Sequence, residues 1–122
     1  MHIKGLYTYR IAKREKESID ATISINESHP LYGGHFPGQP ITPGVCQVSM
    51  VREILEEETG IPLMMSAAKL IKFTAIHEPG VDPEINAAIS FSRKGEHWEV
   101  SAHLHKNEKV FLKFKGEFKD QK

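Results

Sequence analysis

Hydrophobic and polar residues alternate along most of the C-terminal half of the chain. Apolar residues recur at every second position in three stretches, 85–91, 98–104 and 110–116, and polar turns at Lys94-Gly95 and 106–109 separate them. A period of two places the apolar side chains of a strand on one face. The pattern therefore predicts an antiparallel meander with one face buried and the other in water.

The N-terminal half adds further extended segments. Strands are predicted at 6–13 and 18–26, joined by a charged turn at 13–17, and another extended run, 66–77, ends at Glu78-Pro79-Gly80. Only residues 43–59 follow a helical pattern instead. The resulting order is two strands, a loop, one long helix and about four strands, which is an α+β chain whose sheet can wrap a single helix.

The boundaries of the helix at 43–59 are marked by its sequence. Its apolar positions recur at helical spacing: Val48, Val51, Ile54 and Leu55. Thr42 is expected to cap the helix, and Pro43 to occupy its first position, where no N–H is needed. Gly60 and Pro62 are expected to end it. Because glutamates at 56–58 oppose the helix dipole, its stability should come from burying the apolar stripe.

Composition narrows the functional classes. With 122 residues the chain is predicted to be a single domain, 1–122. Its 16 basic and 16 acidic residues cancel, which argues against a nucleic-acid or membrane binder. No apolar run approaches a membrane span, and the first residues lack the apolar core of a secretory signal. The single cysteine, Cys46, fits a reducing compartment, so we expect a cytoplasmic protein.

The stretch 29–45 is the one most indicative of chemistry. It holds four of the seven prolines and four of the nine glycines, which fixes the backbone at many points. It leads into the predicted helix, whose first turn carries free N–H groups and a partial positive charge. His35 can move a proton near neutral pH, while the N–H of Gly44 can hold a carbonyl oxygen. This combination suits proton abstraction next to a thioester carbonyl.

The motif Gly34-His35-Phe36-Pro37-Gly38-x-Pro40-x-x-Pro43-Gly44-Val45 is similar to the signature of the β-hydroxyacyl-acyl-carrier-protein dehydratases of type II fatty-acid synthesis. Weaker matches at His29-Pro30, Lys72-Phe73 and Pro79-Gly80 extend the resemblance over the chain. It implies the hotdog fold, a curved antiparallel sheet wrapped around one long central helix. It also implies a homodimer whose sites combine the histidine of one chain with helix residues of the other. A higher oligomer is compatible with the resemblance.

The resemblance assigns roles to individual residues. His35 falls on the catalytic histidine, and Gly44 on the residue whose N–H polarises the thioester carbonyl. The residues expected to line the acyl or pantetheine path are Phe36, Pro37, Gly38, Pro43 and Val45. The substrate is expected on an acyl-carrier protein, and no cofactor or metal is implied, because the thioester itself acidifies the C2 proton.

The sequence departs from the family at the helix acid. That position, five residues after Gly44, is Ser49, and the position of the family's glutamine, one turn further on, is Glu53. Residues four apart share a helix face, so Glu53 is predicted to take over as the acid, with Ser49 nearby. The alternatives are that Ser49 positions a water, that His35 acts alone, or that Glu53 is a solvated glutamate. The pattern Pro43-Gly44-Val45-x-Gln47 also resembles a dehydratase subgroup associated with aryl-polyene pigments.

Other residues have simpler interpretations. Cys46 could be a thiolate activated by the helix dipole, but a small buried hydrophobe is the expected role. His29 is expected to hydrogen-bond within its loop. His103 and His105 lie two apart on a strand and could bind a metal with His97. No cysteine or carboxylate sits at a characteristic ligand spacing, however, so three solvated histidines and no metal site are predicted. Lys69, Lys72 and Arg52 could receive an acidic carrier protein, although solvated surface charge is the usual explanation.

The predicted activity is therefore dehydration of 3-hydroxyacyl thioesters to trans-2-enoyl thioesters in fatty-acid or polyene-type synthesis. One rival is a hotdog thioesterase that activates water with a helix carboxylate, which the full His-Phe-Pro-Gly motif argues against. The other is a dehydratase-like partner subunit that has lost its acid, which Ser49 favours.

Overall fold

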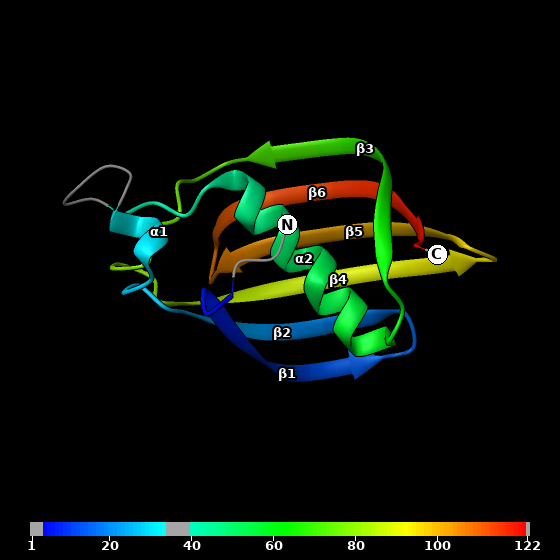
Figure 1. The fold of residues 1–122 in the computed structure, drawn as a ribbon, viewed down its shortest axis with the longest axis horizontal. Coiled ribbons are helices and arrows are strands. Elements are labelled where there is room, and N and C mark those ends of the chain that lie inside the picture. Colours follow the sequence, from blue (N-terminus) through cyan, green and yellow to red (C-terminus); the bar gives the residue numbers. More distant parts are fainter. Residues whose placement is uncertain (1–3, 34–39, 122) are drawn as a thin grey trace.

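A computed structural model describes residues 4–33 and 40–121 of the chain. Its sheet is antiparallel throughout, in the order β1-β2-β4-β5-β6-β3 (Figure 1). The strands are β1 (Tyr7–Glu15), β2 (Ser18–Ile25), β3 (Leu63–Phe73), β4 (Glu84–Lys94), β5 (His97–Lys106) and β6 (Lys109–Asp120). The helices are α1 (Pro30–Gly33) and α2 (Gly44–Thr59). In the described part of the chain, no helix is long and apolar enough to cross a membrane.

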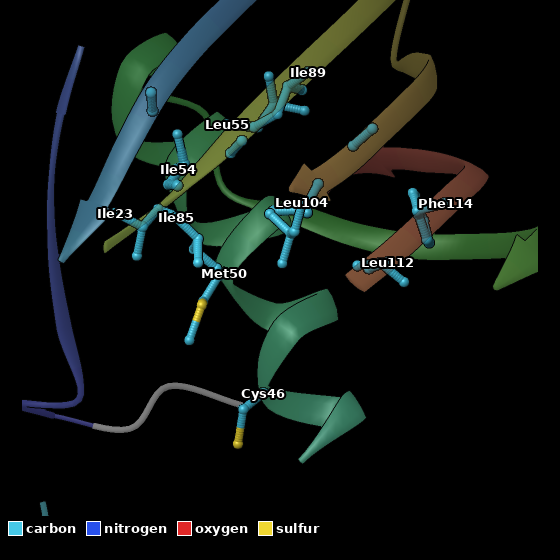
Figure 2. Close-up of a cluster of buried hydrophobic side chains, with 14 of the residues drawn as sticks. Ile23, Cys46, Met50, Ile54, Leu55, Ile85, Ile89, Leu104, Leu112 and Phe114 are labelled. Atoms are coloured by element: carbon cyan, nitrogen blue, oxygen red, sulfur yellow. The ribbon is translucent and has the colours of Figure 1, made fainter. Parts of the chain in front are cut away.

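The helix α2 crosses one face of the sheet obliquely, from the β3 side at its beginning to the β1 side at its end (Figure 1). The curved sheet around one long helix is the architecture expected from the sequence. Side chains of α2 pack against those of the four central strands in the hydrophobic core (Figure 2). The core residues labelled in Figure 2 are Ile23, Cys46, Met50, Ile54, Leu55, Ile85, Ile89, Leu104, Leu112 and Phe114. Burying these apolar groups is what stabilises the helix.

The meander forms as predicted because its alternating pattern is regular. Along β5 buried and exposed residues alternate from His97 to Leu104, so the apolar set faces α2 and the polar set faces water. The tight turns use residues with positive φ, Gly95 at 64° and Asn107 at 53°, which suits a glycine and an asparagine.

The strand β3 corrects the predicted range 66–77. It begins at Leu63 and ends at Phe73, and its pairing with β6 shifts register between Met65 and Ala67 and again between Ala68 and Leu70. Each shift acts as a bulge, which breaks the period of two and bends the strand. The bend is visible where β3 turns to run beside β6 (Figure 1). An irregular pattern of apolar residues therefore hid the first part of the strand.

The start of α2 also differs from the prediction. Pro43, with φ −59° and ψ 145°, precedes the helix as its N-cap residue, and Gly44 is the first helical residue. No side chain caps the helix, because the hydroxyl of Thr42 is used elsewhere. The predicted C-terminal stop is confirmed: Gly60 adopts φ 75°, and its N–H donates to the carbonyl of Glu56.

Candidate active site

A pocket of about 390 Å³ lies at the N-terminal end of α2. Its walls come from the entry to α2 and from the segment after β3: Ile41, Thr42, Pro43, Gly44, Gln47, Phe73, Thr74, Ala75, Ile76 and His77. Hollows of about 480 and 490 Å³ also occur on the sheet, but neither borders a residue that the sequence singled out for catalysis or substrate binding. The pocket at α2 is therefore the candidate active site.

Gly44 stands in the wall of this pocket, where the sequence placed a carbonyl-binding N–H. Being at the start of the helix, its N–H has no partner within α2, and the described residues supply no other acceptor. The ring of Phe73 lies against it so closely that a Cβ on Gly44 would come within 2.8 and 2.9 Å of the ring atoms Cε2 and Cε1. Gly44 thus has a packing reason to be glycine, besides any role towards a substrate.

A buried chain of hydrogen bonds fixes the segment before α2. The Tyr32 hydroxyl lies 2.8 Å from Thr42 Oγ1, which in turn lies 2.7 Å from His77 Nδ1. His77 Nε2 lies 2.8 Å from the carbonyl oxygen of Asp82, and the N–H of Thr42 donates to the carbonyl of His77. Tyr32, Thr42 and His77 are all buried. These hydrogen bonds connect α1, the residues just before α2 and the segment after β3.

The donor and the acceptor in each of these hydrogen bonds follow from the chemistry of the groups. The carbonyl of Asp82 can only accept, so His77 Nε2 carries the proton and donates it. In a neutral imidazole Nδ1 is then the acceptor, so the Thr42 hydroxyl donates to Nδ1 and accepts a hydrogen bond from the Tyr32 hydroxyl. Burial lowers the pKa of His77, against the opposing influence of Asp82, and this keeps the ring neutral. The sequence offered no signal for this network beyond a lone histidine before Pro79.

The helix carboxylate Glu53 is neither in open solvent nor in the pocket. Its side chain is only 11 % exposed, and it accepts a 2.6 Å hydrogen bond from the Tyr7 hydroxyl on β1. Arg52 Nη2 lies 3.8 Å from its second oxygen. Burial, reinforced by the bond to Glu53, raises the pKa of Tyr7, so the phenol stays a donor. The interpretation of Glu53 as a solvated glutamate is therefore wrong, while its catalytic role stays a prediction.

Two other acidic residues of α2, Glu56 and Glu58, are also paired with neighbouring groups. Glu56 accepts from Arg52 at 2.7 Å and from the N–H of Leu63 at 2.7 Å. Glu58 accepts from Tyr9 at 3.0 Å and from Arg14 at 3.2 Å. These partners offset the unfavourable dipole at the end of the helix. Ser49, at the family's acid position, is half-buried.

The remaining predictions concern residues around the helix entry. Cys46 is buried, and burial together with the charge of Glu53 raises the pKa of its thiol, so the activated thiolate is wrong. His29 has the expected structural role, with Nδ1 accepting from the N–H of Leu31 and Nε2 donating to the carbonyl of Lys4. Pro43 lines the pocket, whereas Val45 is 57 % exposed.

Several predicted residues lie outside the described part of the chain: His35, Phe36, Pro37 and Gly38. Among the described residues, no group of three histidine, cysteine, aspartate or glutamate side chains can hold a metal ion. His103 and His105 instead stack at 4.7 Å between ring centroids.

Comparison with known proteins points to one kind of enzyme. The family model described as ApeI-like, for the ApeI dehydratase, matches residues 11–118. An uncharacterized thioester dehydrase from Halalkalibacterium halodurans is 33 % identical over 97 residues, which cover 73 % of this chain and 61 % of the relative. The 3-hydroxyacyl-[acyl-carrier-protein] dehydratase FabZ of Haemophilus influenzae is 32 % identical over 94 residues, covering 67 % of this chain and 61 % of the relative. The chain thus spans about three fifths of the length of these curated relatives.

Solved structures agree on the fold. The dehydratase heterocomplex ApeI:P from Xenorhabdus doucetiae contains a chain that superposes with a TM-score of 0.68 at 18 % identity, covering 92 % of this chain and 98 % of that one. A conserved protein from Pseudomonas aeruginosa reaches a TM-score of 0.66 at 12 % identity, with coverages of 93 % and 88 %. At such low identity these likenesses concern the fold alone, and they confirm the expected hotdog architecture.

Proposed function

We propose that this chain, which belongs to the ApeI-like dehydratase family, removes water from 3-hydroxyacyl thioesters to give trans-2-enoyl thioesters. The observation that carries the proposal is the N–H of Gly44 in the wall of the pocket, which has no acceptor among the described residues and comes nine residues after His35 of the dehydratase motif. Such an N–H is a preorganised donor for the oxygen of a thioester carbonyl whose charge grows as the C2 proton leaves.

In the proposed reaction, His35 removes the C2 proton and Gly44 N–H holds the thioester oxygen. Neutral imidazole suits this step because its ordinary pKa is close to the working pH. The hydrogen-bond chain of Tyr32, Thr42 and His77 supports the geometry, because it fixes the backbone immediately before Gly44. The segments 41–44 and 73–77 then form a rigid wall for the acyl group.

Departure of the 3-hydroxyl needs an acid, and Glu53 is proposed for it. Its low exposure and the short bond from Tyr7 hold the carboxyl in one place. Within this chain the carboxyl faces β1 rather than the pocket, so the proposed proton transfer is to a substrate bound partly by a second copy. Ser49, one turn earlier on the helix, is proposed to lie beside that acid.

A homodimer is part of the same proposal. The strand β3 pairs with β6 on one side only, and no other described strand of the chain pairs with its second edge. Apolar residues are exposed along this strand and just after it: Met64, Leu70, Ile71, Phe73 and Ile76. An open edge flanked by exposed apolar side chains favours pairing with another chain. An acyl-carrier protein as the substrate's carrier, and a cytoplasmic location, stay predictions.

Mass spectrometry of 3-hydroxyacyl-carrier substrates, before and after incubation with the protein, tests the proposal. Dehydration removes the mass of one water from the acyl group while it stays on the carrier. Release of free acid would identify the thioesterase instead, and an unchanged substrate would favour the partner-subunit alternative, to which Ser49 at the acid position lends weight. Adding the enoyl substrate checks the reverse hydration independently.

A further inference from the structure

We infer that Gln47 binds the substrate, its side-chain oxygen accepting a hydrogen bond from a donor on the acyl thioester. Gln47 lies one turn into α2, lines the pocket with Gly44, and is only 3 % exposed. Its Oε1 is buried, and the described residues offer it no hydrogen-bond partner. A buried acceptor left unpaired costs free energy, and an unpaired acceptor beside a pocket is a place where a ligand can supply the partner.

The orientation of the amide follows from its one contact. Gln47 Nε2 donates to the carbonyl oxygen of Thr42 at 3.2 Å. Because that carbonyl can only accept, the NH₂ group must face it, and exchanging the two ends of the amide would set two oxygens against each other. The hydrogen bonds through His77 hold Thr42 in turn, so Oε1 is the end of Gln47 that the described residues leave without a partner.

Other buried oxygens in the described part of the chain do not share this state. Asp82 Oδ2 lies 2.6 Å from Lys109 Nζ, an ion pair that satisfies it. Glu53 Oε2 lies near Arg52, and further interactions engage that residue. Gln47 Oε1 has neither kind of compensation, and it is the one of these oxygens that belongs to a residue lining the candidate active site.

The chemistry of the acceptor defines its ligand, an inference that rests on the proposed function. A 3-hydroxyacyl thioester offers two kinds of donor near its carbonyl: the 3-hydroxyl and an amide N–H of the pantetheine arm. Both lie within a few bonds of the carbonyl that Gly44 is proposed to hold, and Gln47 is three residues, about 4.5 Å of helix rise, from Gly44. The shared chemistry is one neutral hydrogen-bond donor on the substrate.

Gln47→Met is the variant that removes the acceptor. It replaces the amide with an unbranched apolar chain of similar length, which fits a packed interior well. The substitution abolishes the unpaired Oε1 but leaves the Thr42 carbonyl without its donor, so the melting temperature should change little. When ionised, the Gln47→Glu side chain also lacks a donor to Thr42 yet keeps acceptor oxygens, and when protonated it can restore that donor and still accept. Gln121→Met, at an exposed position, is the matched control.

Calorimetric binding of two ligands then tests the inference. 3-Hydroxybutyryl-pantetheine, measured in a His35→Ala background to prevent turnover, carries both donors, and butyryl-pantetheine carries only those of the arm. Gln47→Met should weaken binding roughly 10- to 100-fold, the effect of one buried hydrogen bond, and Gln47→Glu should bind more tightly than Gln47→Met. Weakening confined to the hydroxylated ligand identifies the 3-hydroxyl, whereas equal weakening of both identifies the arm amide.

Turnover by the unsubstituted protein, measured in parallel, separates the inference from the proposed function. Dehydration with unchanged ligand affinity in Gln47→Met would overturn the inference and leave the function standing. Equal weakening in Gln47→Met and Gln47→Glu would assign the loss to the Thr42 contact and would also overturn it. If the protein with Gln47 neither turns over nor binds either ligand, the function and the inference fall together.

Discussion

The two ends of α2 are built in opposite ways. At its C-terminal half the carboxylates of Glu53, Glu56 and Glu58 are engaged by donors from β1, β3 and the helix itself. At its N-terminal end the Gly44 N–H and the Gln47 Oε1 have no partner within the described chain, and a pocket of about 390 Å³ adjoins both.

This difference separates groups that stabilise the fold from groups available to a ligand. A free N–H is normal in the first turn of a helix, but a buried acceptor without a partner, one turn further on, is unusual. They lie at the end of the helix that carries the partial positive charge, where an oxygen with growing negative charge is stabilised. In the C-terminal half, by contrast, the carboxylates bind groups of β1 and β3 and so hold these strands against the helix.

The largest expected effect concerns His35, which precedes α2 in the dehydratase motif. Replacing His35 with Ala should slow dehydration on the order of 10²- to 10⁴-fold, the usual effect of losing a general base, while the melting temperature stays nearly the same. His97→Ala is the matched control, because His97 is exposed on β5. Steady-state kinetics and thermal unfolding check both variants. Wild-type turnover in His35→Ala would refute the assignment, and an unfolded variant would show a structural histidine instead.

Glu53→Gln and Tyr7→Phe test the C-terminal half of α2, where the carboxylates have hydrogen-bond donors. Tyr7→Phe removes the hydrogen bond to Glu53, so it should lower the free energy of unfolding by roughly 1.5–3 kcal/mol, whereas Glu53→Gln keeps an acceptor for the Tyr7 hydroxyl and should lower it less. If Glu53 is the acid, Glu53→Gln should slow dehydration much more than Tyr7→Phe does, and Ser49→Glu should partly rescue it.

The exposed Glu57→Gln serves as the control for this pair. Denaturant unfolding and dehydration rates, measured on the same samples, separate stability from catalysis. Unchanged activity in Glu53→Gln, together with loss of stability in Tyr7→Phe, would make Glu53 a purely structural partner of Tyr7.

The smallest effect concerns pH and the hydrogen-bond chain of His77. Because burial lowers the pKa of His77 below its ordinary 6.5, the folded state favours the neutral ring. As pH falls below 6.5, the unfolded chain binds a proton that the folded chain resists, so the free energy of unfolding should decrease. The contribution is fully present above that pH.

Urea unfolding on either side of pH 6.5 measures this dependence, and His77→Gln should flatten it. His103→Gln is the control: the pKa of His103 is also lowered by desolvation, but its side chain is exposed and far less of the dependence should arise there. An unchanged slope in His77→Gln would show that another group carries the effect.

Local sequence predicted the parts of the fold that depend on local pattern. The regular alternation in β4, β5 and β6 fits only a strand, and the apolar stripe of α2 fits only a helix. The positions of these elements could therefore be predicted from the sequence. The start of β3 did not, because its bulges remove the period of two. Thr42 was a reasonable cap by local rules, yet Tyr32 and His77, brought close only by the fold, take its hydroxyl.

The same distinction applies to the site. Gly44 and the motif around it are local in sequence and were recognised there. The pairing of Tyr7 with Glu53 joins residues 46 positions apart, and no periodic pattern encodes such a contact. Gln47 was visible only as part of a subgroup pattern, because its unpaired oxygen depends on where the Thr42 carbonyl points.

The strand order has a consequence for the sequence of events during folding. The strand β6 lies between β5 and β3, and the residues that pair β3 with β6 are far apart along the chain, as in Leu63 with Asp120 and Phe73 with Leu112. The hairpins β4-β5 and β5-β6 need only short loop closures, whereas β3 has no partner until β6 has been synthesised. On the ribosome, Phe73 therefore reaches Gly44 late, and the pocket is among the last features of the molecule to form.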